Sequence, residues 1–195
     1  MKKATLLSLL VLGMAAAASA QSPAAPAADH PLIVRSGTPD GAAQLTVFCD
    51  LQEEACDRLV IVLRRVVETY PKDVGVTFRH HAAEPHKRSP DAYRAALAAA
   101  RQGKGWEMLD MICANADRLD EAGLGSMAGQ LRLDLDRFAV DVLAGDVEQV
   151  LKDDEAAAKQ ATVDAVPAVL LNGTRVPDAV TFDAIDAALK AAIGK

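Results

Sequence analysis

Apolar and polar residues alternate in two segments in the first half of the chain. In residues 44–49, Leu45, Val47 and Cys49 fall on one face of an extended strand, and residues 74–80 alternate in the same way. An alternation with a period of two is typical of a β-strand. The other face of the first segment also carries an apolar side chain, which favours a central position in a covered sheet.

The segment between these two strands has a helical pattern. From Glu54 to Tyr70, apolar residues recur at steps of three and four, which places them on one face of a helix. Glu53 and Glu54 stand at its start, where negative charge suits the helix dipole, and Pro71 helps to stop it. The order strand, helix, strand predicts a parallel strand pair joined by a right-handed crossover.

The second half of the chain predicts a block of helices, then a hairpin and a last helix. The helical block covers residues 89–102, 106–115, 121–131, 135–143 and 147–161. Ala168–Leu171 has the composition of a buried strand, and Asn172-Gly173 is a hairpin signal that turns the chain back into residues 174–176. Thr181 is placed to cap a final helix that ends near residue 194.

The N-terminus has the order of a signal peptide. Lys2 and Lys3 form a short basic region, residues 6–16 are apolar but too few to span a bilayer, and residues 18–20, Ala-Ser-Ala, have the form of a cleavage site. We therefore expect an exported protein, periplasmic or secreted, whose mature chain begins at Gln21 and has no membrane anchor after cleavage.

The mature chain has the size of one domain, since removal of residues 1–20 leaves about 175 of the 195 residues. Residues 21–36 are interpreted as a flexible lead rich in Ala and Pro, with a short strand over Leu32–Arg35. Residues 37–195 are expected to form the domain, with the helices of about 89–161 inserted between its strands.

Charge and composition exclude several classes of partner. A net charge of −6 without a long basic run argues against binding to nucleic acid. An aromatic content of 4% argues against a surface that stacks on sugars or bases. No motif indicates a cofactor, and nothing in the sequence indicates the oligomeric state.

Residues 48–58, FCDLQEEACDR, resemble the active-site segment of the DsbA-like thioredoxin-fold family, which runs roughly F-S-D-F-Q-C-P-Y-C-K-R. Residues 105–108, Gly-Trp-Glu-Met, resemble its helical insertion, and Val-Pro-Ala at 166–168 followed by Asn-Gly at 172–173 resembles its cis-proline loop. The resemblance implies an α/β, thioredoxin-like fold with a central mixed sheet and an inserted helical subdomain. It also implies protein or peptide substrates, engaged through mixed disulfides.

The resemblance assigns candidate site residues. Glu53 takes the place of the nucleophilic cysteine, and Cys56 keeps the place of the resolving cysteine. Because a carboxylate cannot attack a disulfide, the site is interpreted as degenerate, with weak or monothiol redox activity. Cys49 is a candidate substitute thiol, and Val166 with a cis-Pro167 is the candidate substrate-binding element.

The three cysteines leave several interpretations open. Cys56 lies on the apolar stripe of its helix, so a buried inert thiol competes with a redox role. Cys49 lies on a strand and Cys56 one turn into a helix, a separation that disfavours a disulfide between them but leaves it open. Cys113, on an inserted helix, has the same two interpretations, and an odd count leaves at least one thiol free or bound to another molecule.

The histidines lack the spacing of a metal site. His80 and His81 are adjacent on a strand and point to opposite faces, and the C-x6-C spacing of Cys49 and Cys56 fits no standard zinc pattern. We therefore predict that these histidines, His86 included, lie at a strand exit and in a loop, and that they bind no metal.

Two functions compete for this protein. One is a thiol-disulfide protein of weak activity, and the other is a non-catalytic protein that binds peptides or a partner in the same groove.

Overall fold

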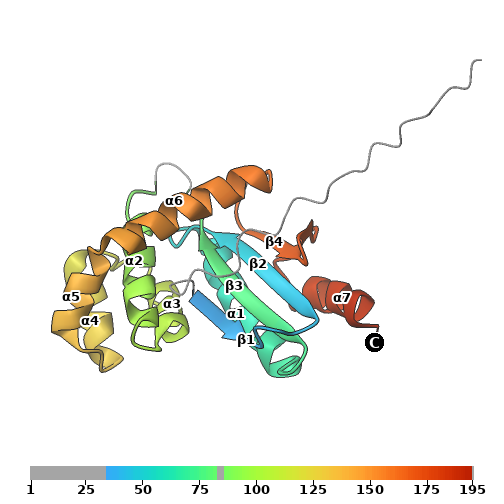
Figure 1. Ribbon diagram of the computed structural model, residues 1–195, viewed down its shortest axis with the longest axis horizontal. Coiled ribbons are helices and arrows are strands. Elements are labelled where there is room, and N and C mark those ends of the chain that lie inside the picture. Colours follow the sequence, from blue (N-terminus) through green and yellow to red (C-terminus); the bar gives the residue numbers. More distant parts are fainter. Residues whose placement is uncertain (1–33, 83–85, 195) are drawn as a thin grey trace, which may run out of the picture.

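A mixed sheet lies at the centre of the computed structural model, which describes residues 34–82 and 86–194. The strands of this described part are β1 (Val34–Gly37), β2 (Ala43–Cys49), β3 (Val74–His80), β4 (Ala168–Leu171) and β5 (Thr174–Arg175). Their order across the sheet is β1-β3-β2-β4-β5 (Figure 1). Strands β2 and β3 are parallel and β4 pairs with β5 as a hairpin, which confirms both predicted pairs. The antiparallel pairing of β4 with β2 and of β1 with β3 completes the sheet.

Helix α1 (Glu54–Thr69) connects β2 to β3. Its apolar stripe is buried, as the steps of three and four predict, and includes Cys56, Leu59 and Leu63. The helix starts directly beyond the carboxyl end of β2, so the residues of the expected active-site segment lie at the edge of the sheet where both parallel strands end. Such an edge is where open α/β sheets usually bind ligands.

The predicted helical block is present between β3 and β4. It consists of α2 (Ser89–Ala100), α3 (Gly105–Cys113), α4 (Glu121–Gln130), α5 (Leu135–Val142) and α6 (Gly145–Gln160). Figure 1 shows α2 to α5 gathered at one end of the sheet, while α6 leads from that end back across it. Each helix begins and ends within two residues of the sequence prediction, and the α/β class with a helical insertion is confirmed.

The C-terminal hairpin and helix follow their local signals. Asn172 and Gly173, between β4 and β5, have positive φ angles of 48° and 82°, the backbone that a tight hairpin turn requires. At the start of α7 (Phe182–Ile193), the Thr181 hydroxyl accepts a hydrogen bond from the backbone N–H of Ala184 at 3.3 Å. The predicted turn and the predicted cap are both confirmed.

Apolar side chains pack against both faces of β2. Leu45 and Val47 belong to the larger core, which includes α1 and the inserted helices. Phe48 points to the other face and packs with Ala158 and Leu170 in a smaller core under α6. The central position predicted for this strand follows from its burial on both sides.

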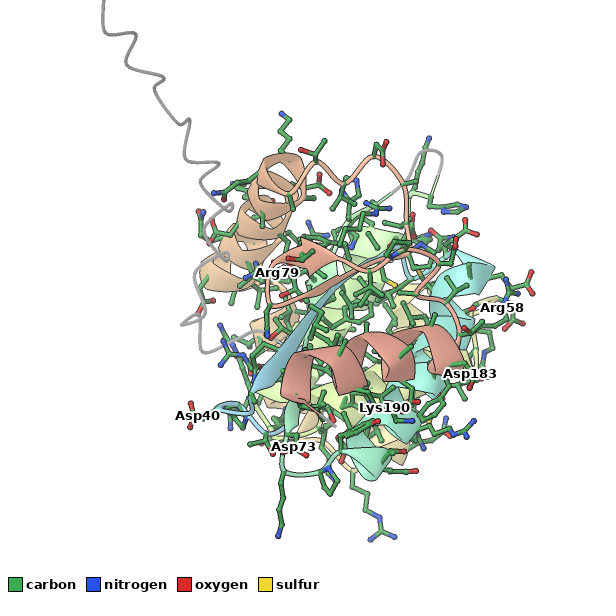
Figure 2. The ribbon with its side chains drawn as sticks, turned by 90° about the vertical axis from the view of Figure 1, so that its right-hand side faces the viewer. Asp40, Arg58, Asp73, Arg79, Asp183 and Lys190 are labelled. Carbon is green, nitrogen blue, oxygen red and sulfur yellow. The ribbon has the colours of Figure 1, made fainter. Side chains whose placement is uncertain are left out.

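A buried ion pair connects the sheet to α6. Arg79 on β3 and Asp154 on α6 have little or no exposure, and their Nη1 and Oδ1 atoms lie 2.7 Å apart. Asp154 also accepts a hydrogen bond from the backbone N–H of His80 at 2.9 Å. Figure 2 shows Arg79 inside the molecule, whereas Asp40 and Arg58 extend at its periphery. No sequence pattern predicted this pair.

Two predictions fall outside the described residues in whole or in part. The signal peptide of residues 1–20 lies entirely outside them. The short strand expected over Leu32–Arg35 lies partly outside, and the described strand β1 runs from Val34 to Gly37.

Candidate functional site

The turn between β2 and α1 is held by the buried side chain of Asp50. Its Oδ1 accepts a hydrogen bond from the backbone N–H of Gln52 at 2.9 Å, and its carbonyl accepts one from the N–H of Glu53 at 3.0 Å. Glu53 is the N-cap residue of α1, with an extended backbone and no capping hydrogen bond from its side chain. The half-buried Glu53 carboxylate therefore lies at the start of α1, where negative charge is favourable.

A second segment, residues 86–89, is hydrogen-bonded to this turn. His86 Nδ1 lies 3.0 Å from Asp50 Oδ2, and the backbone N–H of Leu51 donates to the Ser89 hydroxyl at 2.9 Å. These contacts tie the N-terminus of α2 to the N-terminus of α1. Sequence analysis missed them, because neither periodicity nor spacing marks which polar residues of two distant loops will meet.

Cys49 and Cys56 are brought together at the end of β2. Both side chains are fully buried, both cysteines are free, and the two thiols are close enough to influence each other's ionisation. Burial, followed by the neighbouring Cys56, raises the pKa of the Cys49 thiol well above its ordinary value. The two thiols therefore lie near each other in the core, and no disulfide joins them.

Cys113, the last residue of α3, approaches the same region from a third element. It is partly exposed, and its thiol is hydrogen-bonded to the carboxylate of Asp57 on α1. Burial and the adjacent negative charge of Asp57 raise the pKa of Cys113 far above its ordinary value. The sequence could not indicate this approach, because it depends on how α3 packs against α1.

Pro167 lies at the start of β4, beside the β2 end of the same site. The Val166–Pro167 peptide bond is cis, as the resemblance implies. Ala168 pairs with Phe48, so the antiparallel register places Pro167 next to Cys49. Val166 and Pro167 are half-buried, and the residue before them, Ala165, is exposed. The expected substrate-binding pair therefore lies at the same edge as the start of α1.

Three of the four histidines lie in the part of the chain that the structure describes, and each has a different environment. His80 is 2% exposed and stacks on the ring of Tyr93, and burial lowers its pKa to about 4. His81 Nδ1 lies 3.1 Å from a carboxylate oxygen of Glu155, while His86 contacts the turn described above. Within residues 34–82 and 86–194, no group of three His, Cys, Asp or Glu side chains is arranged to hold a metal ion.

The site thus combines a carboxylate at a helix start with buried sulfur beneath it. A thiol at the position of Glu53 would gain from the helix dipole and from backbone N–H groups. The thiols that are present, Cys49 and Cys56, lie in the core, where the thiolate form is disfavoured. The burial of both thiols makes the geometry poorly suited to rapid sulfur attack.

The chain matches one family model and part of several longer proteins. The model, described as "DSBA-like thioredoxin domain", matches residues 49–190. The chain is 31% identical over 156 residues to "Na(+)/H(+) antiporter NhaA 1" of Mycolicibacterium gilvum, covering 78% of this chain and 25% of that protein. It is 31% identical over 175 residues to "Na(+)/H(+) antiporter NhaA 3" of Salinispora tropica, covering 87% and 26%. The chain therefore spans about a quarter of the length of these relatives.

The antiporter names describe those longer proteins. In the part of this chain that the structure describes, no helix has the length and apolar character to span a bilayer.

Several solved structures have the same fold as this chain. A thioredoxin-like oxidoreductase from Silicibacter pomeroyi has a TM-score of 0.76 at 23% identity, covering 85% of this chain and 95% of that chain. The thiol-disulfide exchange protein α-DsbA2 of Wolbachia pipientis has a TM-score of 0.74 at 13% identity, covering 82% and 86%. A periplasmic thioredoxin-like protein of Salmonella enterica serovar Typhimurium has 0.72 at 19%, covering 86% and 93%.

At these identities the structures show a shared fold, and the family match over residues 49–190 covers most of the chain. The chain belongs to the DSBA-like thioredoxin domain family.

Proposed function

We propose that the protein is an exported member of this family that acts on the thiols or disulfides of protein substrates with weak or monothiol redox activity. Its site is the first turn of α1, where Glu53 stands in place of the attacking cysteine and Cys56 in that of the resolving cysteine. The observation that supports this proposal is the complete burial of Cys56 in the first turn of α1, while the carboxylate residue Glu53 is the N-cap of that helix.

Weak activity follows from the chemistry of the two core thiols. Exchange begins when a thiolate attacks a substrate disulfide, forms a mixed disulfide and releases one substrate thiolate. If Cys56 makes that attack, Cys49 can displace the second substrate sulfur and leave a Cys49–Cys56 disulfide, because the two thiols are neighbours. Both thiols are fully buried, so the turn around Glu53 must open before each attack, and turnover is expected to be slow.

Substrate binding at the same edge is supported by the loop before β4. Val166 is half-buried next to cis-Pro167, and the chain before them is exposed. An extended peptide can pair its backbone with such a strand end without any sulfur chemistry. Protein substrates are therefore proposed to lie across Val166 and the start of α1.

The proposal is tested by reduction of a disulfide-bonded substrate protein, with a small dithiol as the terminal reductant that returns Cys49 and Cys56 to the thiol form. Wild type is expected to turn over slowly, Cys56→Ser to lose that activity, and Cys49→Ser to stop at the mixed disulfide with Cys56, which mass spectrometry detects. Cys113→Ser is the matched control and should retain the wild-type rate. Activity that survives Cys56→Ser would overturn the assignment of Cys56.

A second candidate is a non-catalytic protein that binds peptides or a partner in the same groove. Cys49 and Cys56 are fully buried and Cys113 is partly buried beside a carboxylate, an arrangement that suits inert thiols as well as slow ones. The discriminating protein is the triple variant in which all three cysteines are serine. If the protein is a non-catalytic binder, the triple variant binds an unfolded substrate protein as tightly as wild type. If it is a thiol-redox protein, the triple variant forms no covalent intermediate with the substrate and has no activity.

A further inference from the structure

A cavity of about 560 Å³ lies between the end of β3 and helices α2 and α6. Its apolar walls come from Ala82, Pro90 and Leu151. His80, the last residue of β3, also lines it. The volume falls in the range of pockets that hold small organic ligands.

His80 gives this cavity an unsatisfied polar group. The side chain is 2% exposed, and its Nδ1 has no hydrogen-bond partner among the described residues. The ring is fixed by stacking on Tyr93, with centroids 5.5 Å apart and an angle of 18° between planes. A buried ring nitrogen without a hydrogen-bond partner costs free energy. A ligand that forms a hydrogen bond with this nitrogen removes that cost, which contributes to its binding free energy.

The charged residues around the cavity leave an excess of positive charge. Arg94 and Glu148 neutralise each other, with Nη2 and Oε2 2.7 Å apart. Glu155 also lines the cavity, and its carboxylate lies 3.1 Å from His81 Nδ1. The lining therefore holds two carboxylates against the three cations Arg94, Lys152 and Lys159. Lys152 and Lys159 are exposed on α6, two helical turns apart, and neither forms an ion pair within the described residues. An anionic group is therefore favoured near these lysines.

We propose that this cavity binds an aliphatic chain that ends in a carboxylate, with the chain against Pro90 and Leu151 and the carboxylate between His80 and the two lysines. This site goes beyond the proposed thiol function and is separate from the start of α1. The neutral imidazole in its Nδ1–H tautomer donates to one carboxylate oxygen, and the ammonium groups of Lys152 and Lys159 hold the charge. The same chemistry is offered by a free fatty acid and by the C-terminal residue of a peptide.

The test uses the wild-type protein and two pairs of probes that differ only in charge. The first pair is octanoate and octanamide, and the second is N-acetyl-Ala-Leu as free acid and as amide. Calorimetry measures affinity, and the ¹⁵N chemical shifts of the histidine rings report on His80 directly. Each acid is expected to bind with a dissociation constant about tenfold lower than that of its amide, because it forms one charge-assisted hydrogen bond that the amide lacks. Binding of the acid should also change the ¹⁵N chemical shifts of the His80 ring. The tighter acid identifies the source, fatty or peptidic.

Variants provide the second readout. His80→Phe keeps a ring to stack on Tyr93, and the double variant Lys152→Gln and Lys159→Gln removes the positive charge; each should weaken octanoate about tenfold. Lys72→Gln, an exposed lysine away from the cavity, is the control and should bind as wild type. Equal binding of acid and amide, unchanged His80 shifts at saturation, or no binding of either acid at millimolar concentration would each overturn the proposal, whether or not the variants fold.

Discussion

The carboxylate of Asp154 on α6 lies 2.7 Å from the guanidinium of Arg79 on β3, and the two residues are 0% and 4% exposed. Asp154 also accepts a hydrogen bond from the backbone N–H of His80 at 2.9 Å. One side chain of α6 therefore satisfies a side chain and a backbone group of β3. Because α6 packs over the smaller core that contains Phe48, this contact helps to hold the sheet edge that carries the candidate site.

Asp154→Asn should destabilise the fold by about 3–5 kcal/mol, because it removes the carboxylate that pairs with the buried Arg79 guanidinium. Urea unfolding followed by circular dichroism measures the change. Asp153→Asn is the matched control, since Asp153 is exposed on the same helix, and it should change stability by less than about 0.5 kcal/mol. Equal unfolding midpoints for the two variants would contradict the role given to the buried pair.

His80 should make the protein lose stability in acid. Burial lowers its folded-state pKa from 6.5 to about 4, so the unfolded chain takes up the proton first. This contribution is present above pH 6.5 and is lost as the pH falls to about 4, on the order of 3 kcal/mol in total. Asp154 acts in the opposite direction: its raised pKa of about 6 gives stability below pH 3.8 that is lost as the pH rises through 6.

The two effects are separated with His80→Phe. The stability of wild type relative to this variant should decrease between pH 7 and pH 4, as measured by chemical unfolding at each pH. A constant difference across that range would show that His80 does not titrate as its burial implies.

Glu53→Cys should raise dithiol oxidase activity by roughly an order of magnitude or more, because a thiolate at the start of α1 gains from the helix dipole and has Cys56 three residues away to close a disulfide. Oxidative refolding of a reduced substrate protein gives the rate. The double variant Glu53→Cys with Cys56→Ser, first converted to its mixed disulfide with glutathione, is the control; a substrate thiolate should displace glutathione thiolate and remain bound as a stable mixed disulfide. A rate for Glu53→Cys no higher than that of wild type would argue against the assignment of Glu53 to the nucleophile position.

Thiol accessibility should separate the core sulfurs from the peripheral one. In reduced native protein, a thiol reagent should modify Cys113 slowly and leave Cys49 and Cys56 unreacted, because these two are fully buried. In denaturant all three should react. Rapid labelling of two thiols in the native state would place the sulfurs nearer the surface than their burial indicates.

Local patterns were sufficient for most of the fold. The alternation in β2 and β3, the apolar stripe of α1 and the cap at Thr181 each depend on residues a few positions apart, so they can be read from the sequence alone. The fold class followed from the order of these elements together with the resemblance of residues 48–58 to one family. The position of Glu53 at the start of α1 was likewise apparent, since a helix start is a local feature.

The contacts that define the site depended on packing. Cys49, Cys56 and Cys113 come from a strand and two helices, and only the approach of α3 to α1 brings the third thiol near the other two. Likewise, Asp154 reaches Arg79 across 75 positions of sequence. Periodicity states which face of an element is apolar but not which side chain of a distant element will oppose it. The sequence therefore determined the elements and their order, whereas the buried sulfur contacts, the ion pair and the cavity at His80 were decided by tertiary packing, because each requires side chains from elements that meet only in the folded chain.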